Sequence, residues 1–455
     1  MNCLHVLPEL EALEAEFGDP LVVVGIHSPK FPNERETASL REAIRRHGIG
    51  HPVANDADLA VWDRYGVRGW PTLVLIDPDG YVVGSVAGEG HAPLLRATIA
   101  HLLDAARAAG RLTSGPRPFR LTLEPAQPGA RPRTALAFPG KLLAEREGNR
   151  LVISDTGRHR IVIADRSGLL LDEAGSADRP GFADGPFETA RFREPQGVAL
   201  SGPYLYVADT GNHAIRRLHL GRREVETLAG TGWQQIGPPP LEASEEPREV
   251  PLNSPWDCLV HGGWLYVAMA GCHQIWRLAL DGPPRLERFA GSGLERLADG
   301  PRRTAGFNQP SGLATDGRRL YVADSEASAV RAVELAEDGA VRTLVGRGLF
   351  EFGDADGDGE TARLQHPLGL AWADGILYVA DTYNHKVKRL FPAIRAVSSW
   401  LGTGRPGRAE GCPGALFEPS GVSVAGERIF VADTNNHRIV AAPLATGVLE
   451  EVPLR

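Results

Sequence analysis

Aspartate, asparagine and histidine recur at fixed positions in a segment that repeats six times after residue 134, and all three can bind a metal ion. One copy reads Tyr206-Val-Ala-Asp-Thr-Gly-Asn-His213. The recurring residues are Asp155, Asp209, Asp324, Asp381 and Asp433; Asn212, Asn384 and Asn436; and His159, His213, His273, His385 and His437. Zinc ligands must converge on one ion at roughly 2 Å, whereas these residues are spread one set to a repeat. We therefore interpret them as turn residues whose carboxylates accept from turn amides, and we predict no metal site and no cofactor.

Two copies depart from this pattern. Met269 stands where the aspartate is expected, and Ser328 stands where the histidine is expected. Loss of one structural group can be tolerated in a repeat array, or it can mark a position that faces a ligand. We favour tolerance.

A calcium loop is a second reading that the sequence invites. Asp354, Asp356, Asp358 and Gly359 occupy positions 1, 3, 5 and 6 of such a loop, but Gln365 takes position 12, where a bidentate glutamate belongs. The corresponding place in another repeat, residues 183–191, also contains Asp-Gly. The Asp-Gly pair is therefore expected to belong to the repeat rather than to a calcium site.

The four cysteines, Cys3, Cys258, Cys272 and Cys412, are too few and too scattered for a disulfide framework. Cys258 and Cys272 are expected to be separate small residues of a core or a turn. Cys412 falls in a loop between repeats. Cys3 is the cysteine that could take part in thiol chemistry, for the reason given below.

The repeats predict the fold of residues 134–455. The aspartate position and its Met269 equivalent recur after 54, 60, 55, 57 and 52 residues, and a proline lies 14 residues before it in five of the six copies. Each copy resolves into four short apolar strands separated by Gly, Asn and Pro turns. Six such units predict a six-bladed β-propeller in which each blade is complete in chain order.

Residues 1–112 have a different pattern, with helices and strands in alternation. Leu21-Val-Val-Val-Gly-Ile26 is a continuous apolar run, which is typical of a strand buried on both faces. The other expected elements are helices near 4–17, 33–47, 58–65 and 93–109 and strands at 51–53, 72–76 and 81–86. This segment is predicted to be an α/β domain.

Three stretches of this domain resemble the second half of a thioredoxin fold of the TlpA type: Val53-Ala-Asn-Asp56, residues 62–72 and Ile76-Asp-Pro-Asp-Gly80. The resemblance implies that the bond before Pro71 is cis and lies beside the redox cysteines, with Trp70 and Pro71 shaping a peptide-binding edge. The alternative is an ordinary trans proline that opens a strand.

The family pattern also requires a strand and a Cys-x-x-Cys motif before the first helix. Cys3 stands where the second, resolving cysteine belongs, and its partner would lie three residues earlier, before Met1. Omission of a central strand would expose two rows of backbone groups. We therefore expect that the translation start lies upstream and that the domain, as given, is incomplete. The alternative is a decayed domain whose sheet closes in another way.

The repeats resemble NHL repeats, and the whole chain is similar to the NHL repeat-containing protein 2 family. That resemblance implies an incomplete thioredoxin-like domain (residues 1–112), a Pro/Gly/Arg-rich linker (residues 113–133) and the propeller (residues 134–455). The sequence differs from the family pattern in two ways. It lacks the first cysteine and the strand that precedes it, and it lacks a C-terminal β-domain after Arg455.

Composition limits the function classes. The net charge of −8 and a pI near 6 argue against a nucleic-acid surface, and no apolar run is long enough for a membrane span. We expect a cytoplasmic protein in which thiol–disulfide chemistry is coupled to a propeller that binds a protein or small ligand on its loop face. The alternatives are a non-catalytic scaffold and a propeller enzyme of the lyase or lactonase type.

Overall fold

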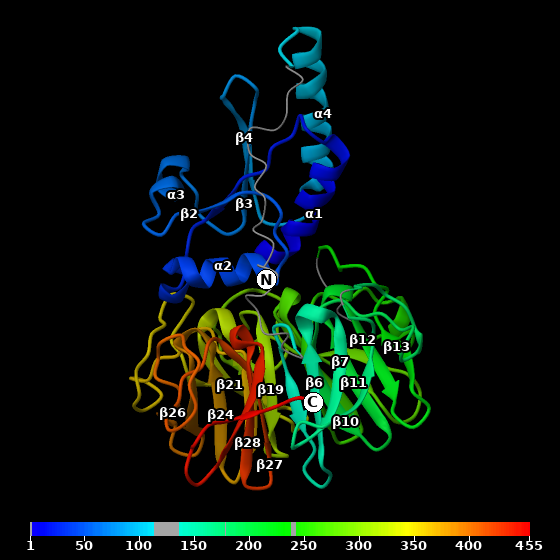
Figure 1. The fold of residues 1–455 in the computed structure, drawn as a ribbon, viewed down its shortest axis with the longest axis vertical. Coiled ribbons are helices and arrows are strands. Elements are labelled where there is room, and N and C mark those ends of the chain that lie inside the picture. Colours follow the sequence, from blue (N-terminus) through cyan, green and yellow to red (C-terminus); the bar gives the residue numbers. More distant parts are fainter. Residues whose placement is uncertain (1, 113–135, 178, 238–242) are drawn as a thin grey trace. The chain divides into compact units, whose positions relative to one another are not determined.

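The computed structural model describes residues 2–112, 136–177, 179–237 and 243–455. The chain divides into two compact units, residues 1–132 and 133–455 (Figure 1). The predicted linker, residues 113–133, lies outside the described residues.

The first unit is α/β. Its elements are α1 (Asn2–Phe17), β1 (Gly25–His27), η1 (Pro32–Arg35), α2 (Thr37–Arg46), β2 (Val53–Asn55), α3 (Ala60–Tyr65), β3 (Thr72–Ile76), β4 (Val82–Ala87) and α4 (Ala92–Ala108). Helices α1 and α4 pack through Leu13, Ile99 and Leu103. The helix expected at residues 33–47 is divided into η1 and α2.

Strands of the first unit form two separate pairs within the described residues. β1 pairs in parallel with β2, and β3 pairs antiparallel with β4. The run from Leu21 was expected to be buried on both faces, and this prediction is wrong: Val22, Val24 and Ile26 are 46%, 52% and 42% exposed. The strand itself is shorter than expected: β1 covers only Gly25–His27, and Val22 and Val24 lie in the irregular segment before it.

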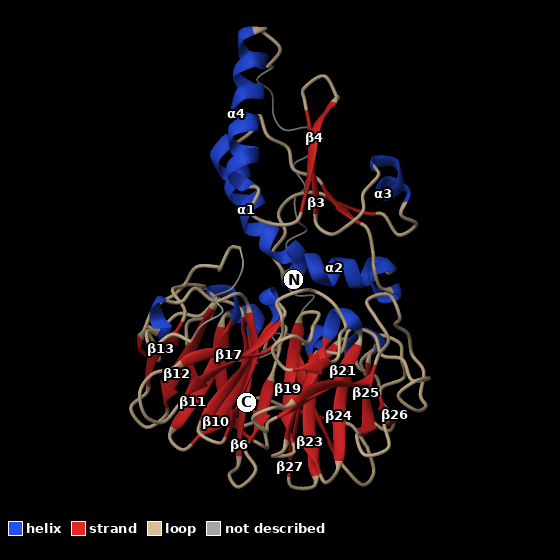
Figure 2. Ribbon diagram, turned by 180° about the vertical axis from the view of Figure 1, so that it is seen from behind, coloured by secondary structure: helices blue, strands red, loops and turns tan. Residues whose placement is uncertain are grey.

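The second unit is built almost entirely of strands (Figure 2). Six antiparallel sheets follow one another along the chain, each with four consecutive strands. In blades 1 to 3 these are β5 (Leu142–Ala144), β6 (Arg150–Asp155), β7 (Arg160–Asp165), β8 (Leu170–Ala174); β10 (Pro195–Ser201), β11 (Tyr204–Asp209), β12 (Ala214–His219), β13 (Glu224–Ala229); and β14 (Pro255–His261), β15 (Trp264–Met269), β16 (Gln274–Ala279), β17 (Leu286–Ala290).

Blades 4 to 6 have the same plan. Their strands are β19 (Pro310–Thr315), β20 (Arg319–Asp324), β21 (Ala329–Glu334), β22 (Ala340–Val345); β23 (Gly369–Ala373), β24 (Ile376–Asp381), β25 (Lys386–Phe391), β26 (Ala396–Leu401); and β27 (Pro419–Ala425), β28 (Arg428–Asp433), β29 (Arg438–Pro443), β30 (Glu450–Val452). Short strands β9 (Gly185–Pro186) and β18 (Gly300–Pro301) join the outer edges of blades 2 and 4. A further 3-10 turn, η4 (Pro247–Glu249), precedes β14. The unit is the six-bladed β-propeller that the repeats predict.

Each apolar core of the propeller lies between two adjacent blades rather than within one. One cluster joins blades 1 and 2, and the next four join each following pair. The sixth cluster, which includes Leu142, Phe430 and Ile439, joins blade 6 to blade 1. The first strands of successive blades also contact one another, and β27 contacts β5. The ring is therefore closed by side-chain packing of the same kind that joins every other pair of blades.

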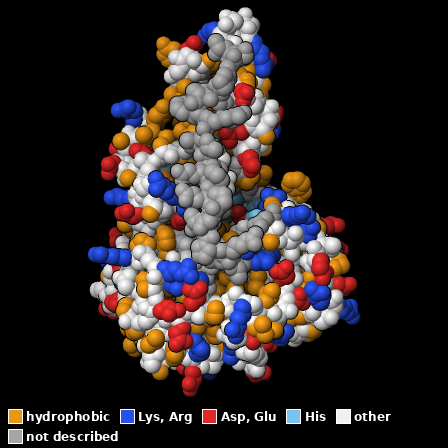
Figure 3. All heavy atoms as spheres, in the orientation of Figure 1, with side chains coloured by type: hydrophobic (Ala, Val, Ile, Leu, Met, Phe, Trp, Pro, Cys, Tyr) orange, Lys and Arg blue, Asp and Glu red, His pale blue; other side chains and the backbone are white. Residues whose placement is uncertain are grey.

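No helix among the described residues is long and apolar enough to cross a membrane. On the face shown in Figure 3, Lys and Arg side chains are interspersed with Asp and Glu over the propeller surface.

Candidate functional site

The repeated aspartate ends the second strand of five blades and is fully buried in each. In blade 2, Asp209 Oδ1 accepts from the amide of Arg193 at 2.8 Å, and Oδ2 accepts from the Asn212 amide at 2.8 Å and from Arg216 at 2.7 Å. The backbone amide donor, that of Arg193, thus belongs to the preceding inter-blade loop, whereas the side-chain amide of Asn212 belongs to the turn after the strand. The other four aspartates accept in the same way from the amides of Ala137, Asn308, Gln365 and Phe417.

Burial raises the pKa of all five repeated aspartates, and that of Asp381 reaches about 6. Each carboxylate has a cationic partner on the third strand, five or seven residues later. The pairs are Asp155–Arg160 at 2.8 Å, Asp209–Arg216 at 2.7 Å, Asp324–Arg331 at 3.0 Å, Asp381–Lys388 at 3.5 Å and Asp433–Arg438 at 2.8 Å. These cations were not predicted from the sequence, although their recurrence in the third strand of five repeats was a usable signal.

The repeated histidine links each blade to the next one. In every blade a 3-10 turn follows the aspartate position and places the next residue in the left-handed region. These turns are η2 (Thr156–Arg158), η3 (Thr210–Asn212), η5 (Ala270–Cys272), η6 (Ser325–Ala327), η7 (Thr382–Asn384) and η8 (Thr434–Asn436). At the left-handed position the histidine Nδ1 accepts from a backbone amide of the following blade at 3.0–3.3 Å. The pairs are His159–Glu194, His213–Ser254, His273–Gln309, His385–Glu418 and His437–Phe138.

The tautomer of these histidines follows from the geometry. A backbone N–H can only donate, so Nδ1 of each ring is unprotonated and the proton of the neutral ring is on Nε2. The histidines lie at five different junctions between blades, and among the described residues no three His, Cys, Asp or Glu side chains are grouped so that they could hold a metal ion. The arrangement is that of a hydrogen-bonded turn.

Ser328 and Met269 have different consequences. The Ser328 hydroxyl accepts from the amide of His366 at 3.2 Å, so the junction between blades 4 and 5 keeps its acceptor. In blade 3, Met269 replaces the aspartate, and the position seven residues later is Trp276 instead of a cation. Both are buried, at 1% and 4% exposed. Blade 3 has therefore lost the charged pair as a unit.

The calcium-like loop engages amines and hydroxyls. Asp354 contacts Lys386 at 2.5 Å and Lys388 at 2.8 Å. Asp356 accepts from the Ser399 hydroxyl at 2.9 Å, and Asp358 accepts from the Thr361 hydroxyl at 2.8 Å. The carboxylates serve the local turn and the buried lysine of blade 5.

In the first unit, Cys3 is exposed in the first turn of α1. The Trp70–Pro71 peptide bond is cis. The Trp70 indole donates to the carbonyl of Ser28 at 2.7 Å, and its ring lies 4.4 Å from that of Trp62. Trp70 is 37% exposed, so part of the indole is available at the surface.

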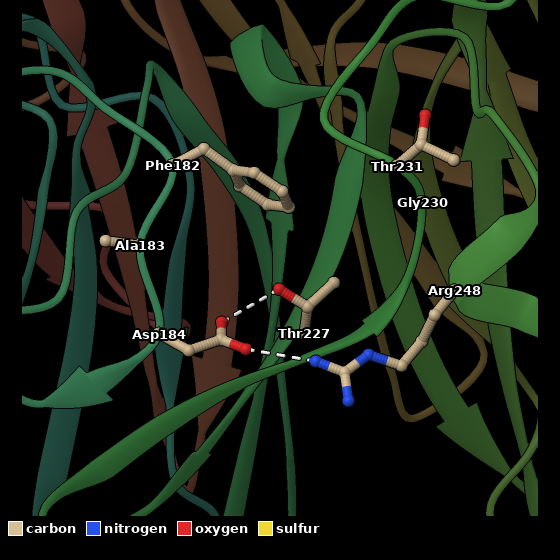
Figure 4. Close-up of a pocket in the computed structure, with 7 residues that line it drawn as sticks. All are labelled: Phe182, Ala183, Asp184, Thr227, Gly230, Thr231 and Arg248. Carbon is tan, nitrogen blue, oxygen red and sulfur yellow. Dashed lines mark hydrogen bonds and ion pairs between the residues drawn. The ribbon is translucent and has the colours of Figure 1, made fainter.

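A pocket of about 330 Å³ on the second blade was not foreseen (Figure 4). It is lined by Phe182, Ala183, Asp184, Thr227, Gly230, Thr231 and Arg248. Asp184 accepts from Thr227 and Arg216 at 2.8 Å each and from Arg248 at 3.1 Å. The loop after β13 also carries Trp233 and Ile236, each 78% exposed. An aromatic ring and a carboxylate from the loop between blades 1 and 2 (Phe182, Asp184) therefore come together with a hydroxyl of β13 (Thr227) and a guanidinium of the loop between blades 2 and 3 (Arg248).

The fold and the repeated turn define a thioredoxin-like module joined to a six-bladed NHL-repeat propeller. A thioredoxin-like family model matches residues 1–82, an NHL repeat model matches residues 418–441, and an LVIVD repeat model matches residues 193–214. The chain is 40% identical to NHL repeat-containing protein 2 of Gallus gallus over 492 residues, covering 100% of this chain and 66% of that protein. The chain belongs to the NHL repeat-containing protein 2 family.

Two other relatives extend the comparison. Protein SUPPRESSOR OF QUENCHING 1, chloroplastic, of Arabidopsis thaliana is 42% identical over 99% of this chain and 44% of its own length. Thiol-disulfide oxidoreductase YkuV of Bacillus subtilis is 23% identical over 22% of this chain and 68% of its own length. The chain thus spans 66% of the length of its chicken relative and less of the plant protein.

Proposed function

We propose that this protein couples thiol–disulfide exchange in its first unit to partner binding by its propeller, in the reducing environment of the cytoplasm. The observation that carries the proposal is Cys3, exposed in the first turn of a 16-residue helix within the thioredoxin-like match. The positive end of a helix dipole stabilises a thiolate, which is the reactive form of cysteine. Likeness to a protein named as a thiol-disulfide oxidoreductase supports the same chemistry.

The proposed exchange requires a second cysteine three residues before Cys3. Its thiolate attacks a substrate disulfide, forms a mixed disulfide and releases one substrate thiolate. Cys3 then attacks the mixed disulfide, which releases the second substrate thiol and leaves a disulfide between the two cysteines. The substrate gains two electrons and the domain loses two, so an external dithiol must reduce the domain for the next cycle. Without the partner cysteine, Cys3 can form a mixed disulfide only.

The propeller would provide specificity. We assign the partner to the loop face, where the loop after β13 lines the pocket around Asp184 with Thr231 and Arg248 and also carries the exposed Trp233 and Ile236. Long loops on a rigid scaffold are the usual place for binding, and exposed aromatic residues are typical anchors. The partner is a protein or a small ligand with both apolar and polar groups.

The proposed thiol–disulfide exchange can be tested by the reduction of insulin in the presence of dithiothreitol. Two forms of the protein are compared: residues 1–455, and the same chain extended by the codons that lie upstream in frame. We expect activity from the extended protein and its loss in Cys3→Ser. Cys412→Ser is the matched control, because Cys412 is also exposed but lies in the propeller. Equal activity in the Cys3→Ser and Cys412→Ser variants would refute the assignment.

A non-catalytic scaffold remains the second candidate, because residues 1–112 contain one cysteine. In that case neither form of the protein reduces insulin, and Trp233→Ala impairs partner capture without any effect of Cys3→Ser.

A further inference from the structure

A proline lies at or just before the start of the first strand of every blade, and the residue two positions later lies next to the central axis. This residue is glycine in four blades: Gly197, Gly312, Gly369 and Gly421. A Cβ atom on these glycines would meet backbone atoms of the next blade at 2.4–2.8 Å, so no side chain fits there. The two exceptions are Lys141 in blade 1 and Asp257 in blade 3, which carry opposite charges.

Lys141 crosses the axis. Its ammonium group donates to the Ser311 carbonyl in blade 4 at 2.8 Å and to the Leu368 carbonyl, immediately before the first strand of blade 5. It lies 3.6 Å from Asp257 Oδ2, and 6% and 12% of the two side chains are exposed. Blade 1 is flanked by blades 2 and 6, so Lys141 reaches three blades with which blade 1 shares no interface.

The acceptors around Lys141 are those that a cation needs. Two carbonyl oxygens and a carboxylate offer negative charge only, and leaving them buried without a positive partner is costly. Asp257 is otherwise held by the amides of Leu313 and Cys258, both at 2.9 Å. Burial lowers the pKa of Lys141 while Asp257 opposes that effect. Burial raises the pKa of Asp257 and Lys141 opposes it.

We propose that the propeller axis contains a monovalent-cation site, formed by the Ser311 and Leu368 carbonyls and the Asp257 carboxylate, in which the Lys141 ammonium is the resident cation. Because the Lys141 ammonium is covalently attached to blade 1, it links blade 1 to blades 3, 4 and 5. It also fills the axis at this level, so ligands reach the propeller from its faces rather than through its centre. If the tether is removed, the vacated site should accept a small ammonium ion from solution.

The test is thermal unfolding of the full chain in methylammonium chloride or tetramethylammonium chloride at equal ionic strength. Lys141→Ala removes the cation and leaves room, and we expect its Tm to fall by roughly 5 °C or more. Methylammonium should recover a large part of that loss, because it has three N–H donors. Tetramethylammonium is larger and has none, so it should recover nothing.

Lys141→Met is the matched control, because methionine fills the same space without charge. It should lose Tm as Lys141→Ala does and respond to neither salt, and the wild type should respond to neither. If Lys141→Ala does not fold in buffer, the yield of refolded protein in each salt gives the same comparison. An unchanged Tm in Lys141→Ala, or equal effects of the two salts on that variant, would overturn the proposal.

Discussion

At the scale of single residues, the buried aspartate and its cation behave as one unit. A buried carboxylate without its partner is far more costly than an apolar pair of similar volume. Blade 3 illustrates this, because Met269 and Trp276 replace both members together and the Trp276 indole donates to Gln274 instead, at 2.8 Å. Trp276 thus compensates for Met269, because no buried cation is left without a carboxylate in blade 3.

Asp381 should make the stability of the folded protein depend on pH. Its pKa of about 6 in the folded state exceeds the ordinary value of 3.8, so the folded protein binds more protons than the unfolded chain between these values. The stabilisation from this group is therefore complete below pH 4 and is lost as the pH rises through 6. Asp381→Asn removes the titration and leaves Lys388 with Asp354 and Asp356.

Urea unfolding at several pH values provides the measurement. Between pH 7 and pH 4 the free energy of unfolding of the wild type should gain up to about 3 kcal/mol relative to Asp381→Asn. Other titrating groups are common to both proteins and cancel in the difference. A difference that does not change with pH would show that the buried carboxylate titrates normally.

At the scale of elements, the turn between the second and third strands positions the acceptors that join each blade to its neighbours. The aspartate accepts an amide from the preceding loop, and the residue after the 3-10 turn adopts positive φ and accepts an amide from the next blade. One short turn therefore stabilises two loops. This explains why histidine and serine both occur there, since each can present an acceptor from a left-handed residue.

The exchange of histidine for serine can be tested at one junction. His213→Ser retains an acceptor at this position for the amide of Ser254, whereas His213→Ala removes the imidazole acceptor. We expect His213→Ala to be less stable than His213→Ser by about 1 kcal/mol in urea unfolding. Ser328→Ala, which removes the natural hydroxyl acceptor, is the control and should lose a similar amount. Equal stability of the two His213 variants would mean that the turn is held by packing.

At the scale of the whole molecule, the ring of blades has no open end. Its closing interface between blades 6 and 1 has an apolar core, a histidine contact from His437 to Phe138, and a hydroxyl contact from Thr434 to the Pro139 carbonyl at 2.8 Å. The same three features occur at the interior junction of blades 5 and 6. The junction where the chain ends meet should therefore be as strong as the others.

Matched core substitutions test this equality. Ile439 and Ile215 occupy the same position of the third strand in blades 6 and 2, and they are 1% and 0% exposed. Each change to alanine should cost about 2–5 kcal/mol, and the two losses should agree within about 1 kcal/mol. A clearly smaller loss for Ile439→Ala, measured by thermal or urea unfolding, would indicate that the ring opens between blades 6 and 1.

The sequence by itself determined the number of blades, their plan of four strands each and the recurring turn, because these depend on local periodicity and on repetition. Only the tertiary structure decided what the turn residues contact. The amide donors to Asp209 and His213 lie 16 residues before and 41 residues after them, and such pairings depend on how blades stack. For the same reason the ion pair of Lys141 and Asp257 could not be predicted from the sequence. These residues are 116 positions apart and meet because a closed ring brings non-adjacent blades to one axis. It also hid the exposed face of the run from Leu21, since burial on both faces requires neighbours that local sequence does not specify.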